Sequence, residues 1–260
     1  FPDVLRAASH WRPDTVLDLE GKGKKLHDEP LTVVDPVDPN RNVAAALTLD
    51  KMLLFSAASR SFLDRPSLEF FFPREYEPLS DEEAQARMDA RGTMPVILQF
   101  QAPDVVEDVL YPQMRKAEES IRALLTRKGF LILRSDVLAY RDRAVILFEM
   151  EGWELSRACR RAGPPVWEAE HVARFLAVHP HPLSGPYIKE GRVVVEESRK
   201  HNCARDLLAA ELEGLSLGKH LSEAIRRGHK IYAGQEILEI RDREFRIFLA
   251  QYLDALAPIY

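Results

Sequence analysis

The sequence predicts an α+β protein with more than one domain. Stretches with helical spacing of apolar residues alternate with short runs typical of strands. A proline-punctuated segment at residues 64–80 indicates a junction between domains. At 260 residues, the chain is long enough for two or three compact units.

Composition indicates a soluble globular protein, with 30% charged residues, 46% hydrophobic residues and a net charge of −5. Any contact with nucleic acid must therefore come from local basic patches. No run of 18 apolar residues occurs, so we expect neither a membrane span nor a signal peptide. Cys159 and Cys203 lack CxxC spacing, which indicates a reducing compartment and no structural zinc. Because Phe1 is not Met, we expect a chain cut from a longer one.

The first 65 residues predict two helices and two strands. Residues 1–11 have the apolar spacing of a helix, and residues 15–19 and 31–34 have the pattern of strands separated by the "GKGKK" turn. Thr48 is placed to cap a helix over 49–63. The apolar face that we expect on this helix consists of Met52, Leu53, Phe55, Ala58, Phe62 and Leu63.

The middle of the chain predicts a β-α-β-β unit. A short charged helix begins at Ser80 and ends near Gly92. The unit then consists of a strand at 93–100, a helix at 103–129, and strands at 130–140 and 143–150. This order resembles part of a ferredoxin-like sheet, which a strand at 68–72 would complete.

The last third of the chain predicts mainly helices. We expect helices at 153–162, 172–178, 203–213 and 217–227, a hairpin at 187–197 that turns at Glu190-Gly191, and a long helix at 237–256.

The sequence contains no recognisable catalytic or metal-binding motif. It has no glycine-rich phosphate loop, no HExxH and no nucleophile elbow. Asp18 and Glu20 could hold a metal, but a solvated strand end is the simpler interpretation. His179 and His181 flank a proline, which indicates a loop. We therefore predict no metal site and no self-contained catalytic site.

Two basic clusters are candidates for binding a phosphate backbone. If residues 153–162 are helical, Arg157, Arg160 and Arg161 lie on one side of that helix. The second cluster consists of Lys219, His220, Arg226 and Arg227, with Lys230 beyond it. The alternative is a solvated charged face without a ligand.

A polar turn follows the second predicted strand, in "VVDPVDPNRNVAAAL" at residues 33–47. The Asp-Pro steps favour extended or turn geometry. Asp35, Asp38, Arg41 and Asn42 are placed to form one hydrogen-bonded corner. That corner is either a structural turn or one that faces a ligand, and the residues alone do not decide between them.

Five segments resemble, in order, the archaeal (class I) CCA-adding enzymes, which are tRNA nucleotidyltransferases. The segments are "VVDPVDPNRNVAAALTL", "RPSLEFFFP", "PDVVEDVLYPQMRKA", "LSRACRRAGP" and "LGKHLSEAIRRG". The resemblance runs from Phe1 to about Gly234. It implies a central-domain portion at 1–65, an RRM-like body domain at 66–151, a tail domain at 152–234 that binds the tRNA elbow, and a helix at 235–260 packing back.

The resemblance also implies an activity: addition of C, C and A to tRNA 3′ ends from CTP and ATP, without a nucleic-acid template, in the cytoplasm. In this family, Mg²⁺ is bound by carboxylates of an N-terminal catalytic domain that residues 1–260 lack, so we expect this chain alone to be inactive. The implied partners are the tRNA acceptor stem and elbow. The resemblance is also compatible with a homodimer.

The resemblance assigns two groups of residues. Asp35, Asp38, Arg41 and Asn42 would lie beside the cleft for the nucleotide and the tRNA 3′ end. The tRNA-binding residues would be Tyr111, Gln113, Arg115, Arg157, Arg160, Arg161, Lys219, His220, Arg226 and Arg227.

One position departs from the family pattern. The helix after "NVAA" is expected to carry an arginine that reads the incoming base, and the aligned residue here is Leu54. Leucine has no donor. Either Lys51 or Arg60 serves instead, or nucleotide selection differs. Two alternative functions stay open: another polymerase-β-type nucleotidyltransferase, such as an oligoadenylate or poly(A) polymerase relative, and a non-catalytic RNA-binding scaffold.

Overall fold

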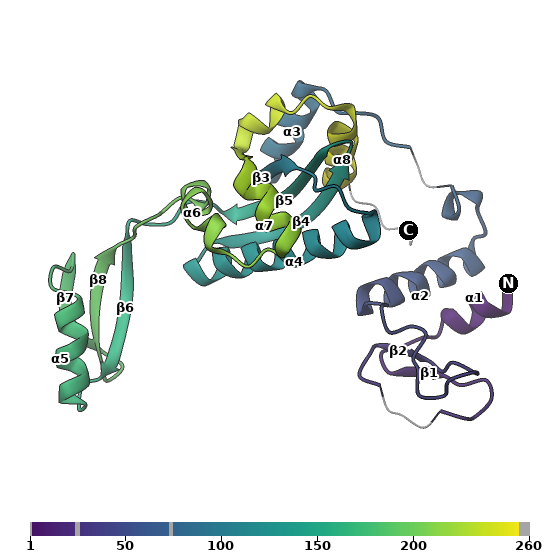
Figure 1. Cartoon of the computed structure of the whole chain (residues 1–260), viewed down its shortest axis with the longest axis horizontal. Coiled ribbons are helices and arrows are strands. Elements are labelled where there is room, and N and C mark those ends of the chain that lie inside the picture. Colours follow the sequence, from purple (N-terminus) through teal and green to yellow (C-terminus); the bar gives the residue numbers. More distant parts are fainter. Residues whose placement is uncertain (1, 24–26, 73–74, 255–260) are drawn as a thin grey trace. The chain divides into compact units, whose positions relative to one another are not determined.

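The structure is a computed structural model that describes residues 2–23, 27–72 and 75–254. It is an α+β protein, as predicted (Figure 1). Two compact units are distinguished: the first runs to Tyr76 and includes Asp254, and the second spans Glu77–Leu253.

The first unit contains the two helices and two strands predicted for it. They are α1 (Pro2–Ala8), β1 (Thr15–Leu17), β2 (Leu31–Val33) and α2 (Leu49–Asp64), and the 3₁₀ turn η1 (Leu68–Phe70) follows them. The side chain of Thr48 caps α2 by accepting from the amide of Lys51, as expected. The two strands are shorter than predicted and pair in parallel. Part of the "GKGKK" turn, residues 24–26, lies outside the described residues.

The apolar face predicted for α2 is only partly correct. Its buried residues are Met52, Ser56 and Ser59. Phe55 is 43% exposed, and Leu53 and Leu63 are each 38% exposed. The small serine side chains occupy the buried positions because α1 packs closely against this helix.

The second unit is built on a four-stranded antiparallel sheet with strand order β4-β5-β3-β9. The predicted capped helix, the β-α-β-β unit and the helices predicted at 203–213 and 217–227 are confirmed. The elements are α3 (Asp81–Arg91), β3 (Met94–Gln101), α4 (Glu107–Lys128), β4 (Leu131–Tyr140), β5 (Arg143–Gly152), α6 (Ala204–Glu211), η2 (Leu212–Gly214), α7 (Lys219–Arg227) and β9 (His229–Ala233).

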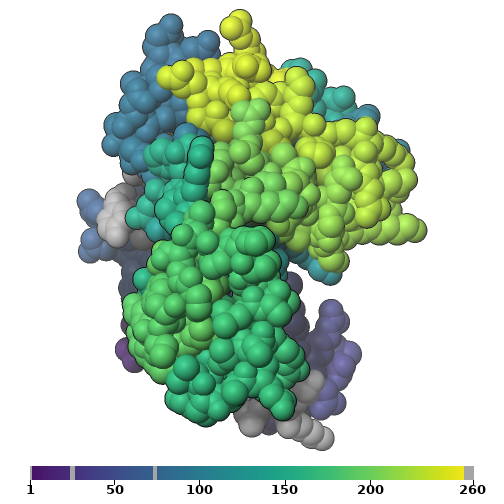
Figure 2. Space-filling model, turned by 90° about the vertical axis from the view of Figure 1, so that its left-hand side faces the viewer, coloured from purple at the N-terminus to yellow at the C-terminus, as the bar shows by residue number. Residues whose placement is uncertain are grey.

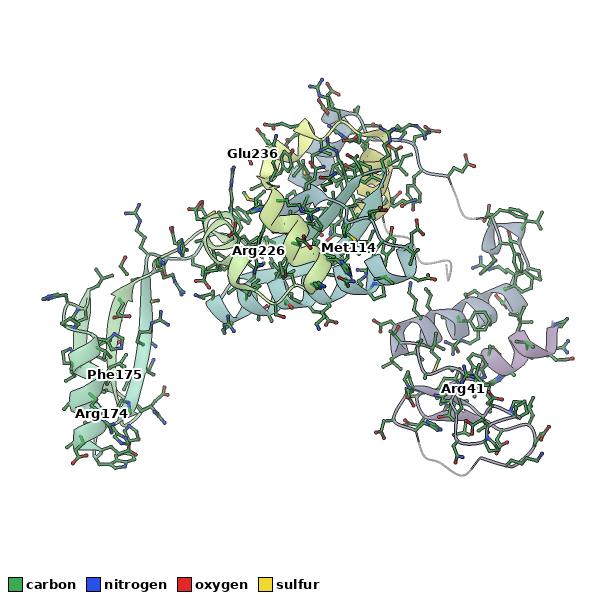
Figure 3. All side chains as sticks on the ribbon, in the orientation of Figure 1. Arg41, Met114, Arg174, Phe175, Arg226 and Glu236 are labelled. Carbon is green, nitrogen blue, oxygen red and sulfur yellow. The ribbon has the colours of Figure 1, made fainter. Side chains whose placement is uncertain are left out.

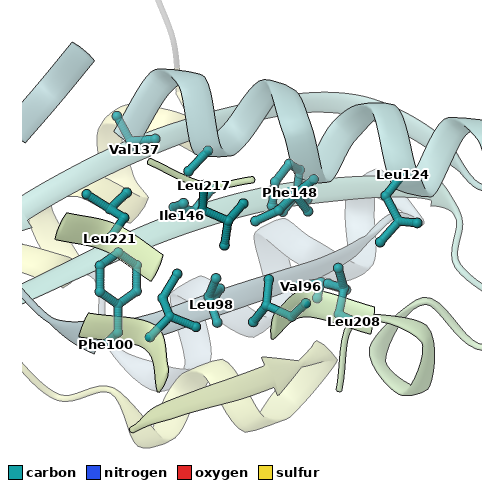
Figure 4. Close-up of a cluster of buried hydrophobic side chains, with 14 of the residues drawn as sticks. Val96, Leu98, Phe100, Leu124, Val137, Ile146, Phe148, Leu208, Leu217 and Leu221 are labelled. Carbon is teal, nitrogen blue, oxygen red and sulfur yellow. The ribbon is translucent and has the colours of Figure 1, made fainter. Parts of the chain in front are cut away.

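One face of this sheet is covered by α4, α6 and α7. The core between them contains Val96, Leu98 and Phe100 of β3, together with Leu217, which precedes α7, and Leu221 in its first turn (Figure 4). Side chains alternate between the faces of a strand, so the intervening residues of β3 point to the second face of the sheet.

The strand predicted at 68–72 is wrong. Leu68–Phe70 is a 3₁₀ turn, and the sheet is completed instead by β9. The ring of Phe62 lies edge-on to those of Phe70 and Phe71, with centroids 5.6 and 5.3 Å apart. These aromatic residues therefore pack on the end of α2 and do not pair as a strand.

The helix predicted at 153–162 is also wrong. A lobe follows β5 and consists of β6 (Ala158–Pro165), α5 (Ala169–Val178), β7 (Ser184–Lys189) and β8 (Arg192–Ser198), with strand order β6-β8-β7. Figure 2 shows this lobe as a continuous teal-green surface. Residues 158–162 pair with β8, and this pairing overrides their helical propensity. Because β6 is an edge strand, it also tolerates Pro164 and Pro165. The predicted hairpin turn at Glu190-Gly191 is confirmed.

The long helix predicted at 237–256 is divided into η3 (Gly234–Glu239) and α8 (Arg243–Leu253), and residues 255–256 lie outside the described part. Arg246 explains the break. Its side chain is 4% exposed and donates to the carbonyls of Ile240 (2.8 Å) and Leu238 (2.6 Å). These bonds satisfy carbonyl groups that a continuous helix would have used.

Candidate nucleic-acid interface

The polar turn of the first unit is held by its two aspartates. Asp35 Oδ1 accepts from the amides of Val37 (2.8 Å) and Asp38 (3.4 Å), and Asp38 Oδ1 accepts from the amide of Asn40 (3.1 Å). Such bonds are typical of Asx turns. The guanidinium of Arg41 lies 3.6 Å from Asp35 and its side chain is 69% exposed (Figure 3). Arg41 is therefore accessible to a ligand, whereas the aspartates stabilise the turn.

Asn42 has a different environment, because it is only 6% exposed. Its Oδ1 accepts from the amides of Val33 (2.8 Å) and Ala44 (2.9 Å), and its Nδ2 donates to the carbonyl of Leu31 (2.9 Å). Asn42 thus joins β2 to the chain that follows the turn. These contacts give it a structural role.

The position aligned with the expected arginine is Leu54, which is half-buried on α2. Lys51 and Arg60 on the same helix are both exposed. Arg60 also lines a pocket of about 480 Å³ in the first unit, together with Trp11, Arg12 and other residues. Lys51 and Arg60 are the two residues that could serve in place of the expected arginine, and Arg60 is the one that lines this pocket.

In the second unit, the structure brings together two of the predicted segments. The side chain of Gln113 on α4 lies 3.4 Å from the point that a Cβ on Gly218 would occupy. Ser120 on α4 donates to the carbonyl of Ser216, at 3.2 Å. The beginning of α7 therefore lies along α4 (Figure 3 labels Met114 and Arg226 on these helices). We call this region the α4–α7 surface, and its residues are Gln113, Lys219 and His220. Tyr111 and Arg115 also lie on α4 but contact β4, since the hydroxyl of Tyr111 accepts from the amide of Ala139 (3.4 Å) and Arg115 donates to Asp136 (2.7 Å).

The cations of α4 and of the α4–α7 surface differ in their partners. Arg115 donates to Glu118 (3.0 Å) and Asp136 (2.7 Å), so its charge is already compensated. Lys219 is exposed and forms no salt bridge with any residue that the structure describes. Because α7 begins here, its first amides and the positive end of its dipole add to this charge. Lys219 is thus the cation of this surface that is open to an anion.

The other end of α7 shows the same contrast. Arg227 is paired with Glu223 at 2.7 Å. Arg226 is exposed and has no salt bridge within the described part of the chain. Lys219 and Arg226 therefore remain as the uncompensated cations of the helix.

The predicted grouping of Arg157, Arg160 and Arg161 on one side of a helix is wrong, because Arg160 and Arg161 lie on strand β6. Adjacent residues of a strand point to opposite faces. Arg160 pairs in register with Glu196, whereas Arg161 forms an ion pair with Glu197 at 3.4 Å. Hydrogen bonds from His179 and Arg161 lower the pKa of Glu197. Arg157 precedes the strand and is exposed.

Sequence reasoning missed a second polar group, in which Gln99 on β3 contacts Arg143 on β5 at 3.1 Å. These residues line a pocket with Gln101 and Lys230. A signal was present, because Gln99 and Gln101 interrupt the otherwise apolar strand "MPVILQFQ". Their neighbours on β5 and β9 could be identified only from strand register.

Within residues 2–23, 27–72 and 75–254, none of the helices combines the length and apolarity that a membrane span requires. Over the same ranges, no three or more His, Cys, Asp or Glu side chains are grouped so that they could hold a metal ion.

These observations define an α+β chain of two units in which Lys219 and Arg226 of α7 are exposed and form no salt bridge with any residue that the structure describes. A family model described as "CCA-adding enzyme, C-terminal domain" matches residues 91–234, and one described as "tRNA nucleotidyltransferase, second domain" matches residues 1–72. The chain belongs to the CCA-adding enzyme family. The resemblance predicted from the five sequence segments is therefore confirmed.

Curated relatives agree with this assignment. The CCA-adding enzyme of Methanosarcina mazei is 36% identical over 255 residues, which cover 97% of this chain and 56% of that protein. The CCA-adding enzyme of Methanothermobacter thermautotrophicus is 38% identical over 260 residues, with 98% and 56% covered. The chain spans about half the length of the curated relatives it matches.

Proposed function

We propose that this chain is the tRNA-binding part of an enzyme that adds C, C and A to the 3′ end of tRNA from CTP and ATP, without a nucleic-acid template. Membership of the CCA-adding enzyme family supports the activity. The observation that carries the binding role is the position of Lys219, an exposed cation without a described counter-ion at the start of α7 and beside α4.

The proposed interaction is with the backbone and shape of tRNA. The net charge of −5 opposes association with RNA, so attraction must come from local cations. Lys219 and Arg226 would neutralise phosphates, and His220 would add a stacking face. Contacts of this kind position an RNA without reading its bases.

We further propose the finer architecture. The β3-α4-β4-β5 order, continued by α7 and β9, supports a ferredoxin-like body of the RRM type. Residues 1–65 would then belong to the central domain, and residues 66–151 would form the body together with α6, α7 and β9. The lobe of β6, α5, β7 and β8 within 152–234 would form the tail that meets the tRNA elbow, and 235–260 would be the C-terminal segment.

The nucleotide and the tRNA 3′ end are proposed to lie beside the polar turn, with Arg41 as the accessible residue. The described residues do not fit a Mg²⁺ site, since they lack a suitable ligand group. We therefore assign the described residues no role in metal binding. The Mg²⁺ ion would be bound by the catalytic domain that the resemblance implies. A tRNA-processing role is compatible with the cytoplasm.

The test is a double substitution, Lys219→Ala with Arg226→Ala, assayed by filter binding to tRNA at several salt concentrations. Each lost phosphate contact should lower the slope of log affinity against log salt by roughly 0.7–0.9. The unmodified chain should bind folded tRNA more tightly than single-stranded RNA of equal length.

The matched control is Arg87→Ala with Arg241→Ala, which removes the same charge from exposed positions on α3 and before α8. It should leave affinity and salt slope nearly unchanged. Equal effects of the two double variants would mean that only net charge matters, and the proposal would then be abandoned.

A further inference from the structure

The second face of the four-stranded sheet has a polar end. Paired residues of neighbouring antiparallel strands share a face, and Gln101 is in register with Arg143, as Gln99 is with Lys230. These four side chains therefore point away from the core that contains Leu98. They line a pocket of about 370 Å³, which lies within the range of small-ligand sites.

The floor of this pocket is a buried hydrogen-bond network centred on Gln99, which is 5% exposed. Its Oε1 accepts from Arg143 (3.1 Å) and from the hydroxyl of Tyr232 (3.4 Å), and its Nε2 donates to the hydroxyl of Tyr140 (3.1 Å). Burial, with the nearby Asp242 charge, raises the pKa of Tyr140 to about 12, so its hydroxyl stays protonated. The amide of Gln99 is thus fixed, and it orients the guanidinium of Arg143.

The two cations of the pocket form no salt bridge with any side chain in the described part of the chain. Arg143 forms no salt bridge in the ranges that the structure describes, and the ammonium of Lys230 lies 5.9 Å from the ring of Tyr232. Arg141, two residues from Arg143, is in contrast paired with Glu244 at 2.9 Å. Asp142 is the carboxylate that lines the pocket, and it opposes an anion there.

We propose that this pocket binds a phosphate group through Arg143 and Lys230, with the Gln101 amide as a neutral donor. Arginine offers a planar fork of donors that matches phosphate oxygens, and lysine adds a point charge. The ligand is either free phosphate or a phosphodiester of an RNA backbone. The pocket shares no residue with the α4–α7 surface, so the inference stands if the proposed role of that surface fails.

The experiment titrates the whole chain with inorganic phosphate by calorimetry, and with tRNA by filter binding over a salt series. The variants are Arg143→Gln and Lys230→Gln, and the matched control is Arg141→Gln. Loss of a charge-assisted hydrogen bond should weaken binding about tenfold. Asp142→Asn should strengthen binding severalfold, because it removes a negative charge from the pocket. This variant leaves the Gln99 network intact, so it tests the proposal even if Arg143→Gln impairs folding.

The outcomes distinguish the source of the phosphate. Binding of inorganic phosphate that Arg143→Gln weakens and Arg141→Gln does not would support a site for free phosphate. If inorganic phosphate does not bind, the pocket can still be a site for an RNA backbone. In that case Arg143→Gln should lower the affinity for tRNA and reduce the slope of log affinity against log salt by roughly 0.7–0.9. The proposal is overturned if Arg143→Gln changes neither phosphate binding nor tRNA binding and Asp142→Asn does not strengthen either. This holds whatever result the variant with Lys219→Ala and Arg226→Ala gives.

Discussion

At the scale of single residues, one buried carboxylate connects several elements of the second unit. Glu149 on β5 is 2% exposed and accepts from Arg91, from Thr93 at 2.7 Å and from Arg134 at 3.3 Å. The guanidinium of Arg134 also lies 4.4 Å from the ring centre of Tyr252 on α8. Burial alone would raise the pKa of Glu149, but the hydrogen bonds from Arg91 and Thr93 outweigh it and lower the pKa.

We predict that Glu149→Gln lowers the free energy of unfolding by about 3 kcal/mol, because Arg91 and Arg134 then lose their counter-charge in a half-buried site. Urea unfolding at neutral pH measures this loss. The exposed Glu119 on α4 provides the control, since Glu119→Gln should change the free energy of unfolding by less than about 0.5 kcal/mol.

The same variant makes the pH dependence testable. Since the pKa of Glu149 is lower in the fold than in the unfolded chain, its stabilisation is fully present above the unfolded pKa and is lost as the pH falls through the folded pKa. The parent should therefore lose stability on acidification more steeply than Glu149→Gln does. Parallel curves for the two proteins would show that Glu149 contributes nothing through its charge.

At the scale of elements, the beginning of α7 depends on the backbone of Gly218. This residue has φ 86° and ψ 154°, a region that is essentially restricted to glycine. It allows Leu217 and Leu221 to enter the core while Lys219 stays exposed. The conformation of one glycine thus fixes how the α4–α7 surface is presented.

We predict that Gly218→Ala destabilises the second unit by about 1–3 kcal/mol through backbone strain, and weakens tRNA binding by displacing Lys219. Gly214→Ala is the matched control. Gly214 has no positive φ, and a Cβ there would meet nothing within 4 Å. Denaturation and filter binding measure both effects, and equal stability of the two alanine variants would contradict the role given to Gly218.

Elements with local signals could be predicted from the sequence. Ser80 and Glu83 form the capping box that begins α3, and Gly92 and Gly129 end α3 and α4 in the left-handed conformation. Strand β6 could not be predicted, because its residues favour a helix until β8 pairs with them. The break before α8 likewise depends on a non-local interaction, since Arg246 also binds Asp81 at 2.6 Å.

The same distinction applies to the candidate site. Lys219 and Gln113 were both identified from the sequence, but their proximity follows from the packing of α7 on α4. The arginines of β6 were grouped wrongly because the grouping assumed a helix. Arg143 was missed because its contact with Gln99 depends on the register of β3 and β5.

At the scale of the whole molecule, the two units have separate sets of buried side chains. The first contains Leu5, Leu31 and Met52, and the second contains Ile121 and Phe148 among many others. Proteins with several units commonly unfold in more than one step.

We predict two transitions in calorimetry of the chain. Asn42→Ala should lower the one that belongs to the first unit, because two amides lose a buried acceptor at a cost of about 1–3 kcal/mol each. Glu149→Gln should lower the other. A single transition that both substitutions lower equally would mean that the two units unfold together.

The long insertion between β5 and β9 has a consequence for synthesis on the ribosome. Strand β3 pairs with β5 on one side and with β9 on the other, and the whole lobe is translated between Gly152 and His229. At about 5–20 residues per second, the second edge of β3 stays unpaired for several seconds after the first three strands have emerged. An open strand edge invites pairing with other chains, so the nascent protein is most prone to aggregate during this interval. Chaperone demand should therefore fall sharply once residues 229–233 leave the ribosome.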